Sequence, residues 1–206
     1  MKYAIIYLHG FNSASLDLSG NLLVSKQKLA VLKQFCEEQN IKLYTPNVDY
    51  RGFKKIINDL LLSFNDFEAA AYKVIFMGSS LGGFTSEYLA MQTKTKAIMI
   101  NPAMSPVTLL PQFIGTTENF ETHQPCDWKI EHCEQYQQYE YELRSSKQKI
   151  DRTILLDMED ELLDSRLTLK QFNASAHIVT YPGGSHSFEH IEQALPTIEK
   201  VIYSIK

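Results

Sequence analysis

The chain has 206 residues, of which 44% are hydrophobic and 21% charged, and its formal net charge at pH 7 is −4. A chain of this length suits one domain, which buries about 70% of the surface that the unfolded chain exposes. The dispersed lysine and arginine residues and the pI near 5.9 argue against a nucleic-acid partner. No apolar stretch approaches the roughly 20 residues that span a bilayer, and Met1 leads into a strand without a signal-peptide pattern. We therefore expect a cytoplasmic protein without a membrane span.

Six short apolar runs predict buried strands. They cover residues 4–8, 41–45, 74–77, 96–100, 153–156 and 177–181. Apolar residues at helical spacing follow these runs and predict helices over residues 22–35, 56–64, 81–92, 165–172 and 188–205. Strands that alternate with helices form a mostly parallel, twisted sheet with right-handed crossovers and helices on both faces. The predicted fold class is therefore α/β, with about six strands in the sheet.

Residues 103–150 interrupt this alternation after the fourth strand. The segment contains three prolines, a polar run at 115–121 and the tyrosines at 136, 139 and 141. Long insertions at the carboxyl edge of such a sheet are usually functional. We therefore expect one domain over residues 1–206, in which 103–150 forms a lid-like insertion. The alternative is a solvated helical excursion without a functional role, and the tyrosines fit either a substrate pocket or simple packing.

The three cysteines, Cys36, Cys126 and Cys133, are an odd number without the density of a disulfide scaffold, so we expect free thiols. Cys126 and Cys133 lie near His123 and His132, but the spacing of these four residues matches no common zinc finger. We interpret this stretch as a polar surface segment, and we expect neither a metal ion nor another cofactor.

Ser80 lies in the pattern Gly78-Ser79-Ser80-Leu81-Gly82, directly after an apolar strand and before a helix. A serine on such a tight turn adopts a strained backbone conformation that raises its hydroxyl above the sheet. The two glycines let neighbouring backbone approach closely, and the helix N-terminus favours a negatively charged oxygen beside the serine. The pattern predicts that Ser80 is a hydrolase nucleophile, although small residues also gather in ordinary strand-to-helix loops.

A serine hydroxyl needs a general base, and His186 is the best candidate. It lies in a glycine-rich loop, Gly183-Gly184-Ser185-His186, between the last predicted strand and the last predicted helix. The order of serine, acid and histidine along the chain is that of α/β-hydrolases. Of the other histidines, we interpret His190 as an exposed helix residue and His177 as a structural residue at a strand start.

The acid that orients the histidine should follow the fifth predicted strand. Five carboxylates compete for this role: Asp157, Glu159, Asp160, Glu161 and Asp164. Asp157 still belongs to the strand end, and Asp164 is expected to cap the helix at 165–172. Asp160, at the tip of the loop, is therefore predicted to hold the tautomer of the imidazole.

The backbone N–H groups of Phe11 and Leu81 are predicted to form an oxyanion hole. In this kind of fold one donor follows the nucleophile, and the second comes from a loop behind an early strand. Gly10 allows a sharp turn that aims the Phe11 amide at the pocket. His9 is expected to brace this loop through hydrogen bonds and not to act as a base.

Five segments of the chain together resemble the small bacterial YqiA/YcfP-type α/β-hydrolases, a family of compact esterases. They are Tyr7-Leu8-His9-Gly10-Phe11-Asn12-Ser13, Gly78-Ser79-Ser80-Leu81-Gly82-Gly83, Asn101-Pro102-Ala103, Asp160-Glu161-Leu162-Leu163-Asp164 and Gly183-Gly184-Ser185-His186-Ser187-Phe188. The resemblance covers nearly the whole chain and implies a triad of Ser80, Asp160 and His186. It also implies activity on short acyl esters or acyl-CoA. In this chain Glu159 stands where the family has a glycine before the acid, which bears on the position of the acid loop.

The sequence therefore predicts a cofactor-free serine hydrolase that cleaves carboxylic esters or thioesters through an acyl-enzyme intermediate. Its partner would be a small acyl ester or thioester, and the chain is expected to be a monomer or a homodimer. The same constellation of residues also serves amidases, peptidases, lactonases and acyltransferases. A second class also stays open, that of a catalytically silent binding protein on a hydrolase scaffold.

Overall fold

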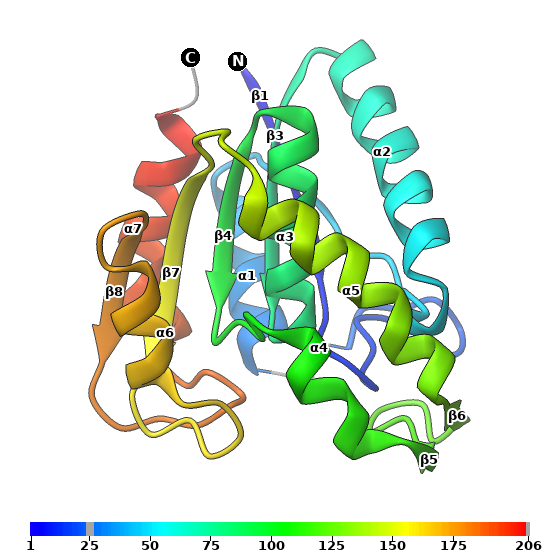
Figure 1. Ribbon diagram of the computed structural model, residues 1–206. Coiled ribbons are helices and arrows are strands. Elements are labelled where there is room, and N and C mark those ends of the chain that lie inside the picture. The colour runs from blue at the N-terminus through cyan, green and yellow to red at the C-terminus, as the bar shows by residue number, and fades with distance from the viewer. Residues whose placement is uncertain (24–26, 205–206) are drawn as a thin grey trace.

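Six parallel strands form one sheet in the order β2-β1-β3-β4-β7-β8 within residues 1–23 and 27–204, which the computed structural model describes (Figure 1). The strands are β1 (Lys2–Leu8), β2 (Lys42–Tyr44), β3 (Tyr72–Ser79), β4 (Lys96–Ile100), β7 (Asp151–Asp157) and β8 (His177–Tyr181). Each of the six predicted runs coincides with one of these strands. The strand order reverses between β1 and β3, and a ligand crevice in an open α/β sheet lies at such a reversal, beyond the carboxyl ends of the strands.

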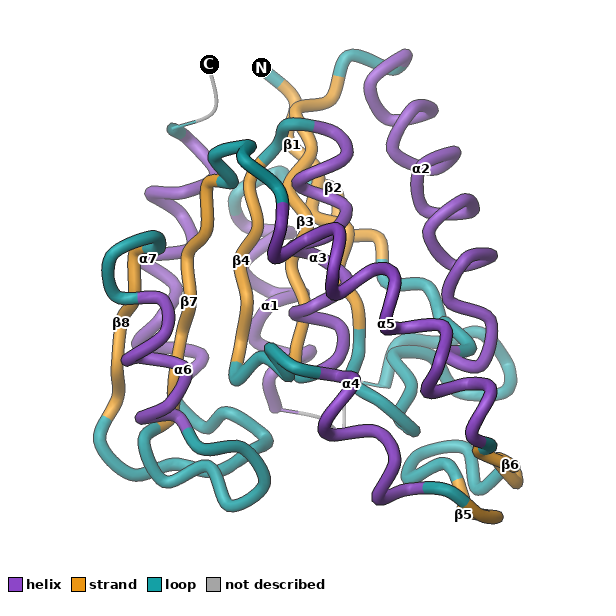
Figure 2. The backbone as a smooth tube through the Cα atoms, in the orientation of Figure 1, coloured by secondary structure: helices purple, strands orange, loops and turns teal. Residues whose placement is uncertain are grey.

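Helices cover both faces of this sheet (Figure 2). The helices are α1 (Gln27–Glu38), α2 (Phe53–Ala69), α3 (Leu81–Thr93), α4 (Pro106–Leu109), α5 (Ile130–Ser145), α6 (Ser165–Phe172) and α7 (Ile191–Tyr203), with short 3-10 turns η1 (Tyr50–Gly52) and η2 (Leu110–Phe113). Alternate strand residues point to opposite faces. In β1, Ile5 and Tyr7 belong to the core under α1 and α7, whereas Ala4 and Ile6 belong to the core under α2, α3 and α5.

Two helices begin later than the sequence predicts. Residue Leu22, expected in a helix, instead pairs with Leu16 in an isolated antiparallel bridge, and α1 begins at Gln27. The last helix begins at Ile191 because Phe188 has a φ of +63°, which a right-handed helix does not accept. Residues 24–26 of the first predicted helix, and the predicted helix end at Ile205, lie outside the described residues.

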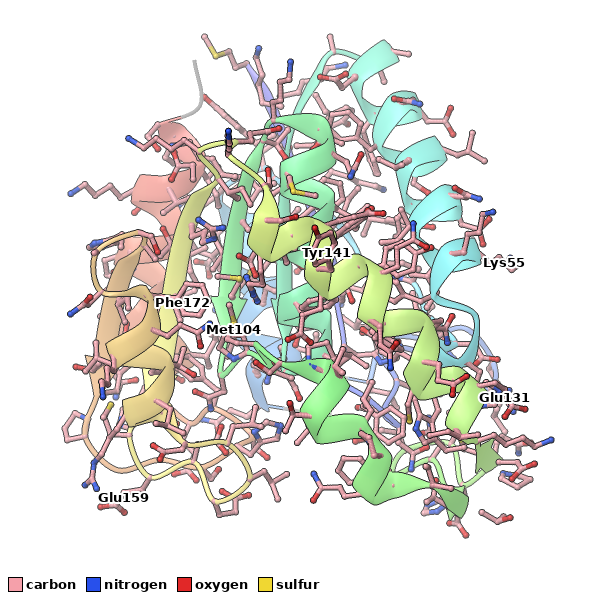
Figure 3. All side chains as sticks on the ribbon, in the orientation of Figure 1. Lys55, Met104, Glu131, Tyr141, Glu159 and Phe172 are labelled. Atoms are coloured by element: carbon pink, nitrogen blue, oxygen red, sulfur yellow. The ribbon has the colours of Figure 1, made fainter. Side chains whose placement is uncertain are left out.

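The insertion after β4 contains an antiparallel hairpin and a long helix. The hairpin consists of β5 (Gly115–Glu118) and β6 (Pro125–Trp128), where the sequence had indicated only a polar run. Helix α5 crosses in front of α3 and towards α2 (Figure 1). The rings of Tyr136 and Tyr139 lie 4.6 Å and 4.7 Å from the ring of Phe53 in α2, and Tyr136 is fully buried. These two tyrosines therefore pack in the core, whereas Tyr141 is exposed (Figure 3).

A buried ion cluster fastens α5 to the body of the domain. Glu87 in α3 has no exposed side-chain surface and accepts hydrogen bonds from Arg144 at 2.9 Å and from Arg152 at 2.6 Å. Arg144 also donates to the backbone oxygen of Met104 over 2.7 Å and lies above the ring of Phe172. A buried carboxylate needs such partners to remain charged. The C-terminal end of the insertion is thereby joined to α3, β7 and α6.

Candidate active site

Ser80 joins β3 to α3 in a conformation that only a strained turn contains. Its backbone angles are φ +54° and ψ −122°, outside the regions that a serine ordinarily adopts. The surrounding glycines make the turn feasible, since a Cβ on Gly78 would overlap the carbonyl of Gly82, and a Cβ on Gly82 would overlap that of Leu8. The predicted strand-to-helix turn is therefore present, with Ser80 at the carboxyl edge of the sheet.

The backbone of Ser80 is fixed by the neighbouring strand and by its own helix. Its N–H donates to the Ile100 oxygen over 3.0 Å, and its oxygen accepts from Gly83 at 2.9 Å and from Ala103 at 3.0 Å. Within residues 1–23 and 27–204, no hydrogen bond uses Ser80 Oγ. The neighbouring Ser79 differs, since its Oγ accepts a hydrogen bond from Lys28 Nζ over 2.6 Å. The two serines of the turn thus have separate surroundings.

The structure brings Asp160 and His186 together. His186 Nδ1 lies 2.8 Å from Asp160 Oδ2, and the Asp160 side chain is fully buried. The second oxygen, Oδ1, accepts from the backbone N–H groups of Leu162 and Leu163 at 2.9 Å and 2.8 Å. An ionised carboxylate can only accept hydrogen bonds, so this contact favours the tautomer whose proton is on Nδ1.

His186 and Ser80 stand on loops behind different strands of the same sheet edge. Within the described ranges no hydrogen bond joins Ser80 Oγ to the imidazole. Catalytic hydrogen bonds in ligand-free enzymes are commonly long and tighten when substrate binds. The structure therefore brings His186, the predicted base, to Asp160, the predicted acid, and Ser80 lies at the same edge of the sheet.

The glycine before the acid, which Glu159 replaces, is not needed for the backbone of this loop. Glu159 is not among the residues with a positive φ, and its side chain extends into solvent (Figure 3). Its N–H donates to the Gly183 oxygen over 3.1 Å, which joins the acid loop to the base loop. The substitution therefore leaves the hydrogen bond between Asp160 and His186 intact.

The loop after β1 passes directly over Ser80. A Cβ on Gly10 would lie 3.1 Å from the Ser80 Cβ and 3.7 Å from its Oγ. Phe11 follows in this loop, and Leu81 is the first residue of α3, where an N–H has no acceptor within its helix. Both predicted oxyanion donors thus belong to segments that flank Ser80.

His9 braces this loop, as predicted. The Val48 N–H donates to His9 Nε2 over 2.9 Å, so the proton of the ring is on Nδ1, which lies 2.8 Å from the Gly10 oxygen. Tyr50 donates from its hydroxyl to the His9 oxygen over 2.5 Å. The ring is buried and committed to backbone partners, which fits a structural role and not that of a base.

The β5–β6 hairpin of the insertion is attached to the same loop. Asn12 donates from Nδ2 to Thr117 Oγ1 over 3.1 Å and to the Glu118 oxygen over 2.6 Å. In return, the N–H of Phe120 donates to the Asn12 oxygen over 3.0 Å. The Phe11 ring packs against Trp128 of β6 at 4.8 Å between ring centres. The insertion therefore contacts the loop after β1 through main-chain, amide and aromatic contacts.

A cavity of about 310 Å³ opens between this loop, residues 47–51 and the hairpin. Its wall includes Phe11, Leu18, Val48 and Trp128, together with the ion pair of Asp49 and Arg51. Clefts of this size and mixed polarity accept small molecules. Ser80 and His186 are not among the described residues that line it, so the cavity adjoins the candidate oxyanion donor and not the nucleophile.

Sequence reasoning did not predict the contacts of three polar residues near His186, namely Asn101, Asp157 and His190. Asn101 Oδ1 accepts from the Asp157 N–H over 2.9 Å, and its Nδ2 donates to the Ser185 oxygen over 2.9 Å. His190, interpreted from the sequence as exposed, is only 21% exposed and lies 2.8 Å from Asp157 Oδ1. That interpretation was wrong because the helix begins after His190, so the ring turns back towards the sheet. The sequence feature that could have indicated this contact was Asp157, an aspartate at the end of a strand.

The described residues contain no group of three histidine, cysteine, aspartate or glutamate side chains placed to hold a metal ion. In the stretch that invited a zinc interpretation, Cys133 accepts a hydrogen bond from Trp128 Nε1 over 3.1 Å, and His132 accepts one from the Lys129 N–H over 3.0 Å. Cys36, Cys126 and Cys133 are free thiols. No helix in the described part of the chain is both long enough and apolar enough to cross a membrane.

Solved structures place this architecture among the α/β hydrolases. Est1E from Butyrivibrio proteoclasticus is similar with a TM-score of 0.74 and 16% identity, over 98% of this chain and 87% of that chain. The α/β hydrolase domain-containing protein 10 from mouse has a TM-score of 0.70 and 16% identity, over 98% and 90% of the two chains. An α-β serine hydrolase homologue from Coxiella burnetii has a TM-score of 0.58 and 13% identity, over 99% and 85%. The protein therefore has the α/β-hydrolase fold.

Within this class, the chain belongs to the uncharacterised protein family UPF0227, which matches residues 4–202. The match confirms the resemblance to the YqiA/YcfP-type proteins that the sequence segments indicated.

Proposed function

We propose that the protein is a serine hydrolase that cleaves carboxylic esters or thioesters, with Ser80 as nucleophile, His186 as general base and Asp160 as the acid that orients it. The observation that carries the proposal is the hydrogen bond of 2.8 Å between His186 and a fully buried Asp160, at the sheet edge where Ser80 occupies a strained turn. The names of the similar structures, which include esterases and a serine hydrolase homologue, support the same reaction class.

The proposed reaction has two halves. His186 Nε2 accepts the proton of Ser80 Oγ as that oxygen attacks the substrate carbonyl carbon, and the Phe11 and Leu81 amides bind the developing oxyanion. The imidazolium then gives its proton to the leaving alcohol or thiol, and the acyl group remains on Ser80. A water molecule, deprotonated by the same imidazole, then attacks the acyl carbon. The bond from that carbon to Ser80 Oγ breaks as the imidazolium returns its proton to Oγ, and the carboxylic acid leaves.

Hydrolysis of a substrate panel tests this proposal. The panel contains p-nitrophenyl acetate and butyrate, acyl-CoA thioesters of increasing chain length and an aryl-acid ester. The last is included because Est1E has been solved with ferulic acid bound. We expect Ser80→Ala to lower turnover by at least 10³-fold. Wild-type turnover in a folded Ser80→Ala protein would overturn the proposal, and cleavage confined to amides would move it to the amidase class.

Labelling with a fluorophosphonate separates an active hydrolase from a silent binding protein on the same scaffold. The wild-type protein should gain one adduct on the peptide that contains Ser80, and Ser80→Ala should gain none. Ser79→Ala is the matched control, because Ser79 lies in the same peptide but its hydroxyl contacts Lys28. Labelling that follows Ser79 instead of Ser80 would contradict the assignment.

A further inference from the structure

A second carboxylate–imidazole pair lies beside the pair of Asp160 and His186. Asp157 Oδ1 is 2.8 Å from His190 Nδ1, and the Asp157 side chain is fully buried. Asp157 is the last residue of β7, three residues before Asp160, and His190 follows His186 by four residues. Each pair therefore joins the segment at the end of β7 to the segment between β8 and α7.

The second oxygen of Asp157 holds the backbone of the base loop on both sides of His186. Oδ2 accepts from the Glu189 N–H over 2.8 Å and from the Ser185 N–H over 3.3 Å. The loop passes so close that a Cβ on Gly184 would overlap the Asp157 carboxylate, and Gly184 has a φ of +77°. Residues 184–189 thus form a turn around the buried Asp157 carboxylate.

His190 completes the partners of Asp157. Its ring is stacked on Tyr181 at 5.3 Å and 12°, directly before α7. With His190 on Oδ1 and two amides on Oδ2, both Asp157 oxygens are engaged, so this carboxylate is not free to orient His186. Asn101, which directly follows β4, forms hydrogen bonds with the Asp157 N–H and with the Ser185 oxygen. These bonds connect Asp157 and the loop at 184–189 to β4.

We propose that Asp157 and His190 are positioning residues for the hydrolase reaction. They hold the loop at 184–189 in the conformation that brings His186 to Asp160, and they make no contact with the reacting atoms. The inference rests on the proposed function, because it concerns the base of that reaction. Misplacing a catalytic group by about 1 Å can lower a rate by about 100-fold, so a fixed loop has a direct kinetic consequence.

Three variants test the pair. His190→Leu removes the donor to Asp157, whereas His190→Asn keeps an N–H donor close to the position of Nδ1. His177→Leu is the matched control, because His177 is exposed at the far end of β8. We expect His190→Leu to lower kcat by about 10- to 100-fold with KM within about twofold. His190→Asn should recover most of the rate, and His177→Leu should equal wild type. A His190→Leu protein with wild-type kcat would overturn the proposal, as would a His190→Asn protein no better than His190→Leu.

Amide hydrogen exchange gives a readout that does not depend on turnover. In His190→Leu the amides of Ser185 and Glu189 should exchange faster, while amides of β1 and β3 should keep their wild-type rates. Uniformly faster exchange throughout the domain would show general destabilisation and overturn the positioning role. Failure of the proposed function is distinguishable, because it would appear as equal turnover in wild type and Ser80→Ala. In that case the exchange rates alone would show whether Asp157 and His190 order the loop at 184–189.

Discussion

Asn101 Oδ1 accepts a hydrogen bond from the Asp157 backbone N–H over 2.9 Å, across the boundary between β4 and β7. The same side chain donates to the Ser185 oxygen, and the residue before it, Ile100, accepts the N–H of Ser80. One amide side chain therefore connects the strand beside Ser80 with the strand that precedes Asp160 and with the loop that contains His186.

Two substitutions of Asn101 should distinguish the contribution of its hydrogen bonds to stability from the contribution of its backbone conformation. The φ of Asn101 is +39°. Asn101→Gly tolerates that φ but removes the side-chain hydrogen bonds to Asp157, Ser185 and His186, so we expect a loss of about 2–3 kcal/mol in the free energy of unfolding. Asn101→Ala should lose about 1 kcal/mol more, because alanine is strained there. Urea denaturation measures both. Equal stabilities of the two variants would contradict the claim of backbone strain.

Removing the charge of Asp160 should impair catalysis without unfolding the protein. Asp160→Asn no longer stabilises the imidazolium or fixes Nδ1 as the donor, so kcat should fall by about 10³- to 10⁴-fold. Glu159→Gly, which introduces the family residue, should keep wild-type kcat because the Glu159 side chain is exposed. Steady-state kinetics on the best ester distinguishes the two. A full rate in Asp160→Asn would reassign the acid.

Substituting Gly82 should disrupt the turn of the nucleophile. A Cβ at this position would overlap the carbonyls of Leu8 and His9, which are backbone atoms and cannot rotate away. We expect Gly82→Ala to lose more than about 3 kcal/mol of stability and to lose activity. Gly52→Ala is the control, because a Cβ there would meet nothing closer than 3.9 Å. Thermal unfolding followed by circular dichroism measures both variants.

Neutralising Glu87 should destabilise the attachment of α5. Glu87→Gln leaves the guanidinium groups of Arg144 and Arg152 without their charged partner, and we expect a loss of about 3 kcal/mol. The control is the exposed pair that Asp59 forms on α2 with Lys55. Figure 3 labels Lys55. Lys55→Gln should change stability by less than about 0.5 kcal/mol. Similar losses in both variants would show that burial of the Glu87 cluster is unimportant.

The protein should become less stable in alkali, in part through Cys36. Burial raises the pKa of this thiol from 9.0 to about 12, with a smaller contribution from Glu37. Between those pH values the unfolded chain has lost the proton and the folded chain keeps it. The free energy of unfolding therefore falls as pH rises, by up to about 1.4 kcal/mol per pH unit.

Cys36→Ala should remove this contribution, so its unfolding free energy should fall less steeply between pH 9 and pH 11. Urea denaturation at four pH values measures the slope. Tyr141→Phe, at an exposed position, serves as the control. Identical slopes in wild type and Cys36→Ala would contradict the buried state of the thiol.

The sheet could be predicted because its central strands are continuous apolar runs that only a buried parallel strand accommodates. β4 and β8 have the predicted bounds, and the turn at Ser80 follows from its glycines. The hairpin in the insertion could not be predicted, since Gly115–Glu118 and Pro125–Trp128 have four residues each and include glycine, glutamate, proline and aspartate, which are depleted in strands. Its pairing instead accompanies contacts with Asn12, more than 100 residues away in the chain.

In the candidate site, the meeting of Asp160 and His186 could be predicted from their order along the chain, because strand ends in a parallel sheet meet at one edge. The partners of Asp157 could not. Its role depends on Phe188 and Gly184 adopting positive φ values, which turn His190 and two amides towards one carboxylate. Local propensity does not determine such a loop, since several hydrogen bonds from distant residues act on it together.

The bond from Asn12 to the hairpin has a consequence for protein engineering. Asn12 follows Phe11, the candidate oxyanion donor, and the hydrogen-bond partners of its side chain, Thr117 and Glu118, belong to the insertion. Grafting a foreign hairpin to change the pocket wall would therefore also disturb the loop that contains Phe11 and Asn12. Libraries that keep residues 117–120 and vary the helix and turns around them would change the pocket wall while preserving the contacts of Asn12.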